Sequence, residues 1–200
     1  MGVVSLPLTA EPIRFVSGEM DTIELASAEK LIRAARKQLG VTTSYDPSYM
    51  RIGYPNGDVP EDRGVCIDVV IRAYRSAFTF DFQKVIHEDM VRSFAQYPKI
   101  WGLKKPDRNI DHRRVPNMET WLARQGHEVK GQDWKVGDLM TCRLPGNLPH
   151  IVVVARDAPA RAPLLRVVHN IGRGAREESI LMTGLSGIRH FRFYPEKSNR

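Results

Sequence analysis

The chain has 200 residues, of which 42% are hydrophobic, and we expect one globular domain with a sizeable core rather than two domains. Its 30 Lys and Arg residues against 23 Asp and Glu residues give a formal net charge of +7, which favours an anionic partner such as nucleic acid, acidic lipid or anionic cell-wall polymer. The basic residues are scattered and form no long cluster interleaved with aromatic residues, so we predict no specific nucleic-acid partner.

The two cysteines, Cys66 and Cys142, are too few for a disulfide framework. No run reaches the ~18 apolar residues of a membrane span, and the first ten residues lack the basic n-region and full apolar core of a signal peptide. We therefore expect no membrane span, and either a protein that acts where it is made or an exported protein whose signal is absent from this chain. We predict no cofactor, and the oligomeric state stays open.

An extended arm is predicted at the N-terminus. Residues 1–24 contain Pro7 and Pro12 and show no clear apolar period. The globular domain is then predicted over residues 25–195, and residues 196–200 form a short tail.

A helix and a long loop open this domain. Residues 25–39 place apolar side chains on one helical face, with Gly40 at the end of the helix. Residues 41–64 are rich in Pro, Gly, Asp and Tyr, which predicts an irregular loop of a length that is usually functional. Tyrosines of this loop either line a cleft or cover an edge of the core, and they are Tyr45, Tyr49 and Tyr54.

Cys66 stands at the head of the next predicted helix, which is buried. Apolar side chains follow it at helical spacing, namely Ile67, Val70, Ile71, Tyr74, Ala77 and Phe78. A helix start carries unpaired N–H groups and a partial positive charge, and both favour a thiolate. We therefore expect the pKa of this thiol to be lowered, toward the roughly 3.5–7.5 of activated cysteines. The alternative is a structural cysteine, a residue type that is often buried.

Two further helices are predicted before the last third of the chain. Asp81 is expected to cap the first, whose apolar face runs to Tyr97 before Pro98 ends it. Asn117 is expected to cap the second, which Gly126 ends.

Between these helices, residues 98–116 form a second long loop with alternating acidic and basic side chains. This pattern suits a rim that grips a charged substrate, and it suits a plain surface loop equally well. We assign Arg113 and Arg114 of this loop to substrate binding, together with Tyr45 and Asp68.

The last third changes from a helical to an alternating period. Short β-rich runs separated by Pro, Gly, Asp and Asn are typical of an antiparallel meander, and they cover residues 138–144, 150–156, 164–170 and 189–194. Helices followed by strands predict an α+β fold.

Two histidines occupy meaningful positions in the meander. His150 opens one strand, and His169 and Asn170 close the next. A hairpin loop centred near Ala160 puts position 150 opposite 169 or 170, because paired positions in an antiparallel hairpin sum to a constant. The choice between His169 and Asn170 depends on a one-residue slip in register and stays open.

Cys66, His150 and a third polar residue together supply a nucleophile, a base and a group that orients the base. His150 would take the thiol proton and return it to the leaving amine, while His169 or Asn170 fixes the tautomer of its ring. N–H groups at the head of the Cys66 helix suit the oxyanion of a tetrahedral intermediate. A zinc site is a weaker alternative, since no CxxC, HExxH or HxH spacing occurs. Each histidine taken alone would be an ordinary surface residue.

Several runs resemble known families. The cysteine on a helix, followed by residues 137–139, 149–154 and 168–170, resembles the NlpC-type papain-fold peptidases that cut bacterial cell-wall peptides. Longer runs resemble a bacterial family catalogued as a domain of unknown function in the same papain-fold group, and these runs are residues 64–74, 87–90, 109–117 and 168–172.

This resemblance implies a papain-like α+β fold in which the nucleophile helix packs on the meander. It also implies Cys66 as nucleophile, His150 as base, His169 as third polar residue, and a periplasmic or secreted setting. NlpC-type enzymes carry before the cysteine an Asp that helps to hold the free amine of the substrate, whereas this chain has Val65 there.

We therefore predict a cysteine hydrolase that cleaves amide bonds in peptidoglycan stem peptides as an endopeptidase. The same triad suits an amidase, a transglutaminase or an acyltransferase, because a thioester intermediate can pass to water or to an amine. The competing class is a non-catalytic binding module on the same fold. The predicted partner is peptidoglycan or another peptide, with no metal.

Overall fold

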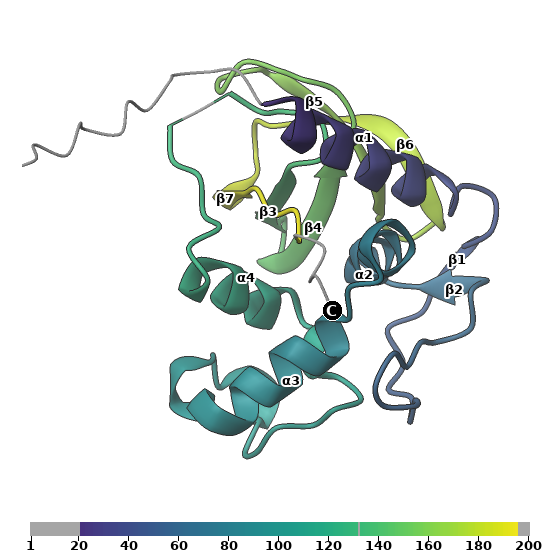
Figure 1. Ribbon diagram of the computed structural model, residues 1–200, viewed down its shortest axis with the longest axis vertical. Helices are drawn as coiled ribbons and strands as arrows, with labels where there is room; N and C mark the ends of the chain where they lie inside the picture. Colours follow the sequence, from purple (N-terminus) through teal and green to yellow (C-terminus); the bar gives the residue numbers. More distant parts are fainter. Residues whose placement is uncertain (1–20, 132, 196–200) are drawn as a thin grey trace, which may run out of the picture.

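A five-stranded antiparallel sheet lies at the centre of the computed structural model, which describes residues 21–131 and 133–195 (Figure 1). The helices are α1 (Thr22–Arg36), α2 (Cys66–Phe78), α3 (Phe82–Ser93) and α4 (Val115–Arg124). The strands of the sheet are β3 (Leu139–Leu144), β4 (Leu148–Val154), β5 (Leu164–Asn170), β6 (Ala175–Leu181) and β7 (Ser186–Phe191). Helices first and an antiparallel sheet afterwards confirm the predicted α+β class.

The order of strands in the sheet is β6-β5-β4-β3-β7. Strands β3 to β5 follow one another as the predicted meander, β6 extends it by one strand, and β7 then returns to pair with β3 at the far edge. Strand β6 was not predicted. Its sequence, Ala-Arg-Glu-Glu-Ser-Ile-Leu, has the charged residues of an edge strand, and its pairing with β5 along the full length makes it a strand.

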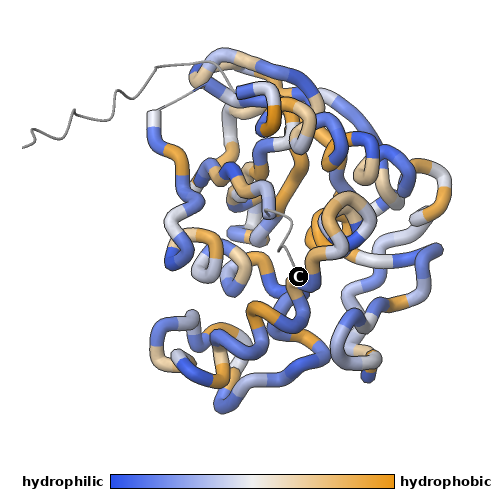
Figure 2. The backbone as a smooth tube through the Cα atoms, viewed as in Figure 1, coloured by the Kyte–Doolittle hydropathy of each residue, from blue (hydrophilic) through white to orange (hydrophobic). Residues whose placement is uncertain are grey.

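The two faces of the sheet bury separate hydrophobic clusters. One face packs against the helices through Leu139, Ile151, Val153 and Val168, in the cluster that also holds Cys66. The other face carries Met140, Cys142, Val152, Val154, Leu165 and Val167, covered by Trp134. Figure 2 shows the corresponding hydrophobic colouring of α2 and the central strands. The two cysteines belong to different clusters, and both are free thiols.

Some helix boundaries differ from those expected. Helix α1 begins at Thr22 because Asp21 caps it, accepting from the N–H of Glu24 at 2.7 Å. Residues 22–24 therefore belong to the helix and not to the predicted arm, and the helix ends at Arg36 rather than at residue 39. The remainder of the predicted arm, 1–20, and the predicted tail, 196–200, lie outside the described residues.

The predicted caps give one confirmation and one correction. Asp81 caps α3, accepting from the N–H groups of Gln83 and Lys84, although the helix ends at Ser93, short of the predicted end. Asn117 does not cap α4. The helix already begins at Val115, since a proline in its first turn presets the helical φ, and the side-chain amide of Asn117 donates to the carbonyl of Asp111 at 2.9 Å.

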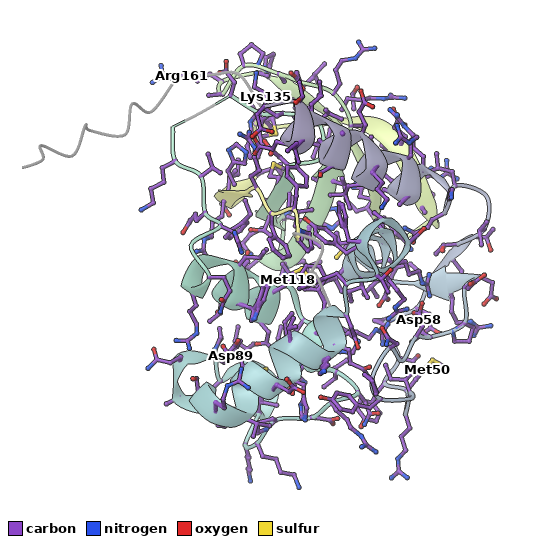
Figure 3. All side chains as sticks on the ribbon, in the orientation of Figure 1. Met50, Asp58, Asp89, Met118, Lys135 and Arg161 are labelled. Atoms are coloured by element: carbon purple, nitrogen blue, oxygen red, sulfur yellow. The ribbon has the colours of Figure 1, made fainter. Side chains whose placement is uncertain are left out.

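Side chains from α2 hold the long loop 41–64 in place. The guanidinium of Arg72 donates to the carbonyl oxygens of Val59, Pro60 and Arg63 and pairs with Asp58 at 3.0 Å. Asp58, labelled in Figure 3, lies beside α2 and also pairs with Arg75 at 2.9 Å. The carbonyl groups of this irregular backbone thus accept from buried donors, which fixes the segment that leads into α2.

None of the helices in the described part of the chain has the length and apolar character that a membrane span requires.

Candidate active site

Cys66 is the first residue of α2, as predicted, and it is buried. Val65 caps the helix with an extended backbone, and its N–H donates to the Asp68 carboxylate at 2.7 Å. Backbone N–H groups of Ile151, Ile67 and Cys66 itself face the sulfur and act to lower its pKa. Because Ile151 follows His150 directly, the sulfur lies against the strand segment that carries this histidine.

Burial, however, raises the pKa of the Cys66 thiol to about 12, despite the N–H groups that lower it. The predicted lowering is therefore wrong for the free protein, because desolvation of a thiolate in the core outweighs the helix N-terminus. Burial likewise raises the pKa of Cys142 to about 11. Both thiols are neutral at pH 7.

His150 and His169 are in direct contact. The Nε2 atom of His150 lies 2.9 Å from the Nδ1 atom of His169. Val153 pairs with Val168 and Val154 with Val167, so the register differs from both predicted alternatives. Extending it puts position 152 opposite 169, and the two histidines meet as diagonal neighbours on one face.

Glu178 of β6 continues this chain of contacts. Its Oε1 atom lies 2.9 Å from the Nε2 atom of His169. A carboxylate accepts only, so Nε2 of His169 carries the proton and its Nδ1 accepts from Nε2–H of His150. The Nδ1 atom of His150 is then left unprotonated, as a general base requires, and it has no hydrogen bond within the described residues.

The same burial keeps the imidazoles neutral. Burial lowers the pKa of His150 to about 3, and the neighbouring His169 contributes to the lowering. Burial also lowers the pKa of His169, although Glu178 acts in the opposite direction. The free protein thus holds a neutral thiol and a neutral base, and not the thiolate–imidazolium pair.

Asn170, the alternative third residue, has a different position. Its side-chain amide donates to the carbonyl oxygens of Ser44 at 3.1 Å and Gly64 at 2.9 Å, while its oxygen accepts from the N–H of Gly172 at 3.2 Å. Asn170 therefore ties β5 to the segment before Cys66, and His169 is the residue that contacts the base.

Cys66 and His150 line one cavity of about 600 Å³. Both predicted loops contribute walls, and most of the lining is apolar or aromatic. The lining residues from these loops are Tyr45, Pro47, Tyr49, Trp101, Ile110, Arg113, Arg114 and Val115, and the hairpin between β3 and β4 adds Leu144, Leu148 and Pro149. Tyr54, the third tyrosine considered for a cleft, instead packs edge-on against His87.

Of the four residues assigned to substrate binding, Tyr45, Arg113 and Arg114 line this cavity, and Asp68 does not. Asp68 forms a buried bidentate pair with Arg113, with both contacts at 2.8 Å, and it also accepts from Val65. These three donors occupy most of the acceptor positions of the carboxylate, and a substrate-binding role for Asp68 stays a prediction.

Glu178 and Trp101 were missed by sequence reasoning. Glu178 lies in a strand whose charged sequence gave no β signal, although two adjacent acids a few residues after the histidine-bearing strand were visible. Within residues 21–131 and 133–195, no group of three or more His, Cys, Asp or Glu side chains is placed to hold a metal ion.

Comparison with known proteins places this site in a family. Residues 32–193 match the family described as Domain of unknown function (DUF1287). The chain belongs to the DUF1287 family. The match includes Cys66, His150, His169 and Glu178, so the whole candidate site lies within the DUF1287 region.

A relative in Escherichia coli strain K12, the uncharacterized protein YijF, is 49% identical over 164 residues, which cover 80% of this chain and 78% of that protein. No solved structure matches the chain significantly.

Proposed function

We propose that this DUF1287 protein is a cysteine hydrolase that cleaves amide bonds in peptidoglycan stem peptides, acting as an endopeptidase on a papain-like fold. One observation carries the proposal. A thiol at a helix head and a tautomer-fixed imidazole, held by His169 at 2.9 Å, line the same cavity. Nucleophile, base and orienting group are the components that acyl transfer through a thioester requires.

Catalysis starts from the neutral pair. As the Cys66 sulfur attacks the substrate carbonyl, its proton passes to Nδ1 of His150, and a C–S bond forms. The N–H groups at the head of α2 stabilise the oxyanion. The imidazolium then gives its proton to the leaving amine as the C–N bond breaks. Water attacks the thioester with His150 as base, which releases the acid and restores the thiol.

The substrate class is supported by the resemblance to NlpC-type peptidases and by charge. A net charge of +7 attracts the protein to an anionic wall polymer, with binding that weakens as salt rises. A periplasmic or secreted setting is part of this proposal, since the polymer lies outside the cytoplasmic membrane.

Acyl transfer to an amine is a second candidate, favoured by the mostly apolar lining of the cavity. Apolar walls limit the access of water, so a thioester would survive long enough to meet an amine. A transglutaminase or an acyltransferase would then join two peptides where a hydrolase or an amidase releases them. The mass of the product distinguishes these reactions.

A non-catalytic binding module is favoured by a different observation, the raised pKa of the Cys66 thiol. In that case the cavity would bind a peptide without cutting it. Removal of the Cys66 thiol would then leave the affinity for the peptide unchanged, and there would be no activity to lose.

The test is digestion of purified peptidoglycan by the wild type, Cys66→Ala and His150→Ala, with fragments identified by mass. We expect new muropeptides from the wild type, none from Cys66→Ala, and a rate ~10²–10⁴-fold lower from His150→Ala. Cys142→Ala is the matched control, because it removes the other buried thiol and should keep the activity. Intact peptidoglycan after treatment with the wild type would contradict the hydrolase.

A further inference from the structure

The cavity beside Cys66 contains an imbalance of charge. Arg113 and Arg114 both line it, and no Asp or Glu is among its lining residues in the described part of the chain. Arg113 is neutralised, since its Nε and Nη2 atoms bind the two carboxylate oxygens of Asp68. Arg114 is therefore the lining cation whose charge needs a partner.

The side chain of Arg114 is held in place, but its guanidinium lacks an ionic partner and one hydrogen-bond acceptor among the described residues. Its guanidinium lies over the indole of Trp101, 5.0 Å from the ring centroid, and it forms no ion pair with the residues that the structure describes. Its Nη1 atom is buried and has no hydrogen-bond partner there. A buried guanidinium nitrogen without an acceptor is unfavourable, and a ligand oxygen would remove that cost.

The nearby acid Asp107 does not fill this role. Its carboxylate accepts from the hydroxyl of Tyr49 at 3.0 Å and from the backbone and side chain of Asn109 at 2.9 and 3.0 Å. Burial raises the pKa of Asp107, but these hydrogen bonds and the charge of Arg114 together lower it below its ordinary value. Asp107 is thus an ionised neighbour with its own donors, and it leaves Nη1 of Arg114 without an acceptor.

Trp101, which lies beside the guanidinium of Arg114, has a strained backbone conformation. Its backbone has φ of 61° and ψ of 30°, a left-handed conformation that bulky residues rarely adopt. The residue is 57% exposed, and its indole nevertheless lies against the guanidinium. A cation–π contact of this kind restrains the side chain of an arginine.

We propose that Arg114, which lies over the ring of Trp101, binds a carboxylate of the substrate, so that the preferred substrates are amides that carry a free carboxylate close to the bond that is cut. This inference rests on the proposed function and names its substrate class. The guanidinium donates to the carboxylate oxygens, and the apolar walls of the cavity strengthen the contact by excluding water. Stem peptides, which carry several free carboxylates, meet this requirement, and their amidated forms do not.

The test measures binding to the full chain carrying Cys66→Ala, which cannot turn the ligand over. Two probes are titrated by calorimetry: a stem tetrapeptide with free carboxylates, and the same peptide with every carboxylate converted to a carboxamide. We expect the free acid to bind at least tenfold more tightly. Adding Arg114→Gln should abolish that preference, and Arg114→Lys should keep part of it, because a lysine retains the charge without the planar fork.

The matched control is Arg33→Gln, which removes an exposed arginine of α1 that does not line the cavity and should leave the preference intact. Equal binding of the two probes, no binding of either, or a preference that survives Arg114→Gln in a protein with unchanged circular dichroism would overturn the inference. Turnover separates it from the hydrolase proposal. Cleavage of both probes at equal rates refutes only the carboxylate site, whereas selective binding without cleavage by the wild type refutes only the hydrolase.

Discussion

His169 orients His150 through a single contact: Nδ1 of His169 accepts from Nε2–H of His150 at 2.9 Å. The direction of this hydrogen bond depends on Glu178, whose carboxylate takes the other proton of His169. A residue of the edge strand β6 thus decides which nitrogen of the proposed base is free, although it does not touch the cavity.

The first prediction concerns Glu178. We expect Glu178→Gln to lower kcat by roughly ten- to a hundredfold with little change in KM, since an amide can offer a proton to His169 and reverse the tautomers. Glu177→Gln is the control, because Glu177 pairs with Arg36 and Arg166 and not with the histidines. Equal effects of the two substitutions on kcat would remove Glu178 from the mechanism.

The second prediction concerns the reactivity of Cys66 in the free protein. Because burial raises the pKa of this thiol to about 12, we expect iodoacetamide to label it slowly below pH 7 and faster as the pH rises above 9. Cys142→Ala leaves a single thiol and makes the measurement unambiguous. Rapid labelling of Cys66 at pH 6 would instead indicate a thiolate–imidazolium pair before substrate binds.

The third prediction concerns stability in acid. An unfolded histidine titrates near 6.5, whereas burial lowers the pKa of His150 to about 3. Between these values the unfolded chain binds a proton that the folded protein refuses, so the stability present above pH 6.5 is lost as the pH falls toward 3. At pH 4.5, two pH steps below 6.5, His150 alone accounts for about 2–3 kcal/mol of that loss.

Urea unfolding of the wild type and of His150→Gln at pH 7.0 and 4.5 measures this loss. The difference in unfolding free energy between the two pH values should be smaller for the variant. Burial also lowers the pKa of His112 to about 3, so His112→Gln should reduce the difference in unfolding free energy between the two pH values in the same way. An identical pH dependence in the wild type and both variants would show that these histidines accept protons in the folded state.

The fourth prediction concerns the buried pair of Asp68 and Arg113. Asp68→Asn leaves the guanidinium without its counter-charge and should lower the unfolding free energy by roughly 3–5 kcal/mol. The double variant Asp68→Asn with Arg113→Met should lose less, because no uncompensated charge remains buried. Denaturant midpoints of the two single variants and the double variant provide the cycle, and strictly additive losses would contradict a direct pairing.

Local sequence patterns predicted the components of the candidate site but not their surroundings. The helix that begins at Cys66 and the strands that bear His150 and His169 follow from apolar periods and turn residues, which are local signals. The partner of His169 did not follow, because β6 becomes a strand through its pairing with β5 rather than through its own composition. The predicted register between β4 and β5 was also wrong, because the pairing of Val153 with Val168 is set by contacts between the strands and not by the sequence of either strand alone.

The pKa of the thiol and the role of Asp68 depend on tertiary burial. A helix N-terminus is visible in the sequence, whereas the desolvation that outweighs it at Cys66 depends on what packs around the sulfur. Asp68 and Arg113 are 45 residues apart, and each resembles a free surface charge until the fold brings them together. The sequence therefore indicated which residues carry charge, and the structure shows which of these charges are already matched.

Asn170 has a mechanical consequence for the site. Its amide donates a hydrogen bond to the carbonyl of Gly64, two residues before the nucleophile, at 2.9 Å. The adjacent His169 accepts a hydrogen bond from the base, His150. The end of β5 is thereby in contact with both the segment that leads to Cys66 and the proposed base His150. A displacement of this strand would therefore act on the segment before the nucleophile and on the imidazole together.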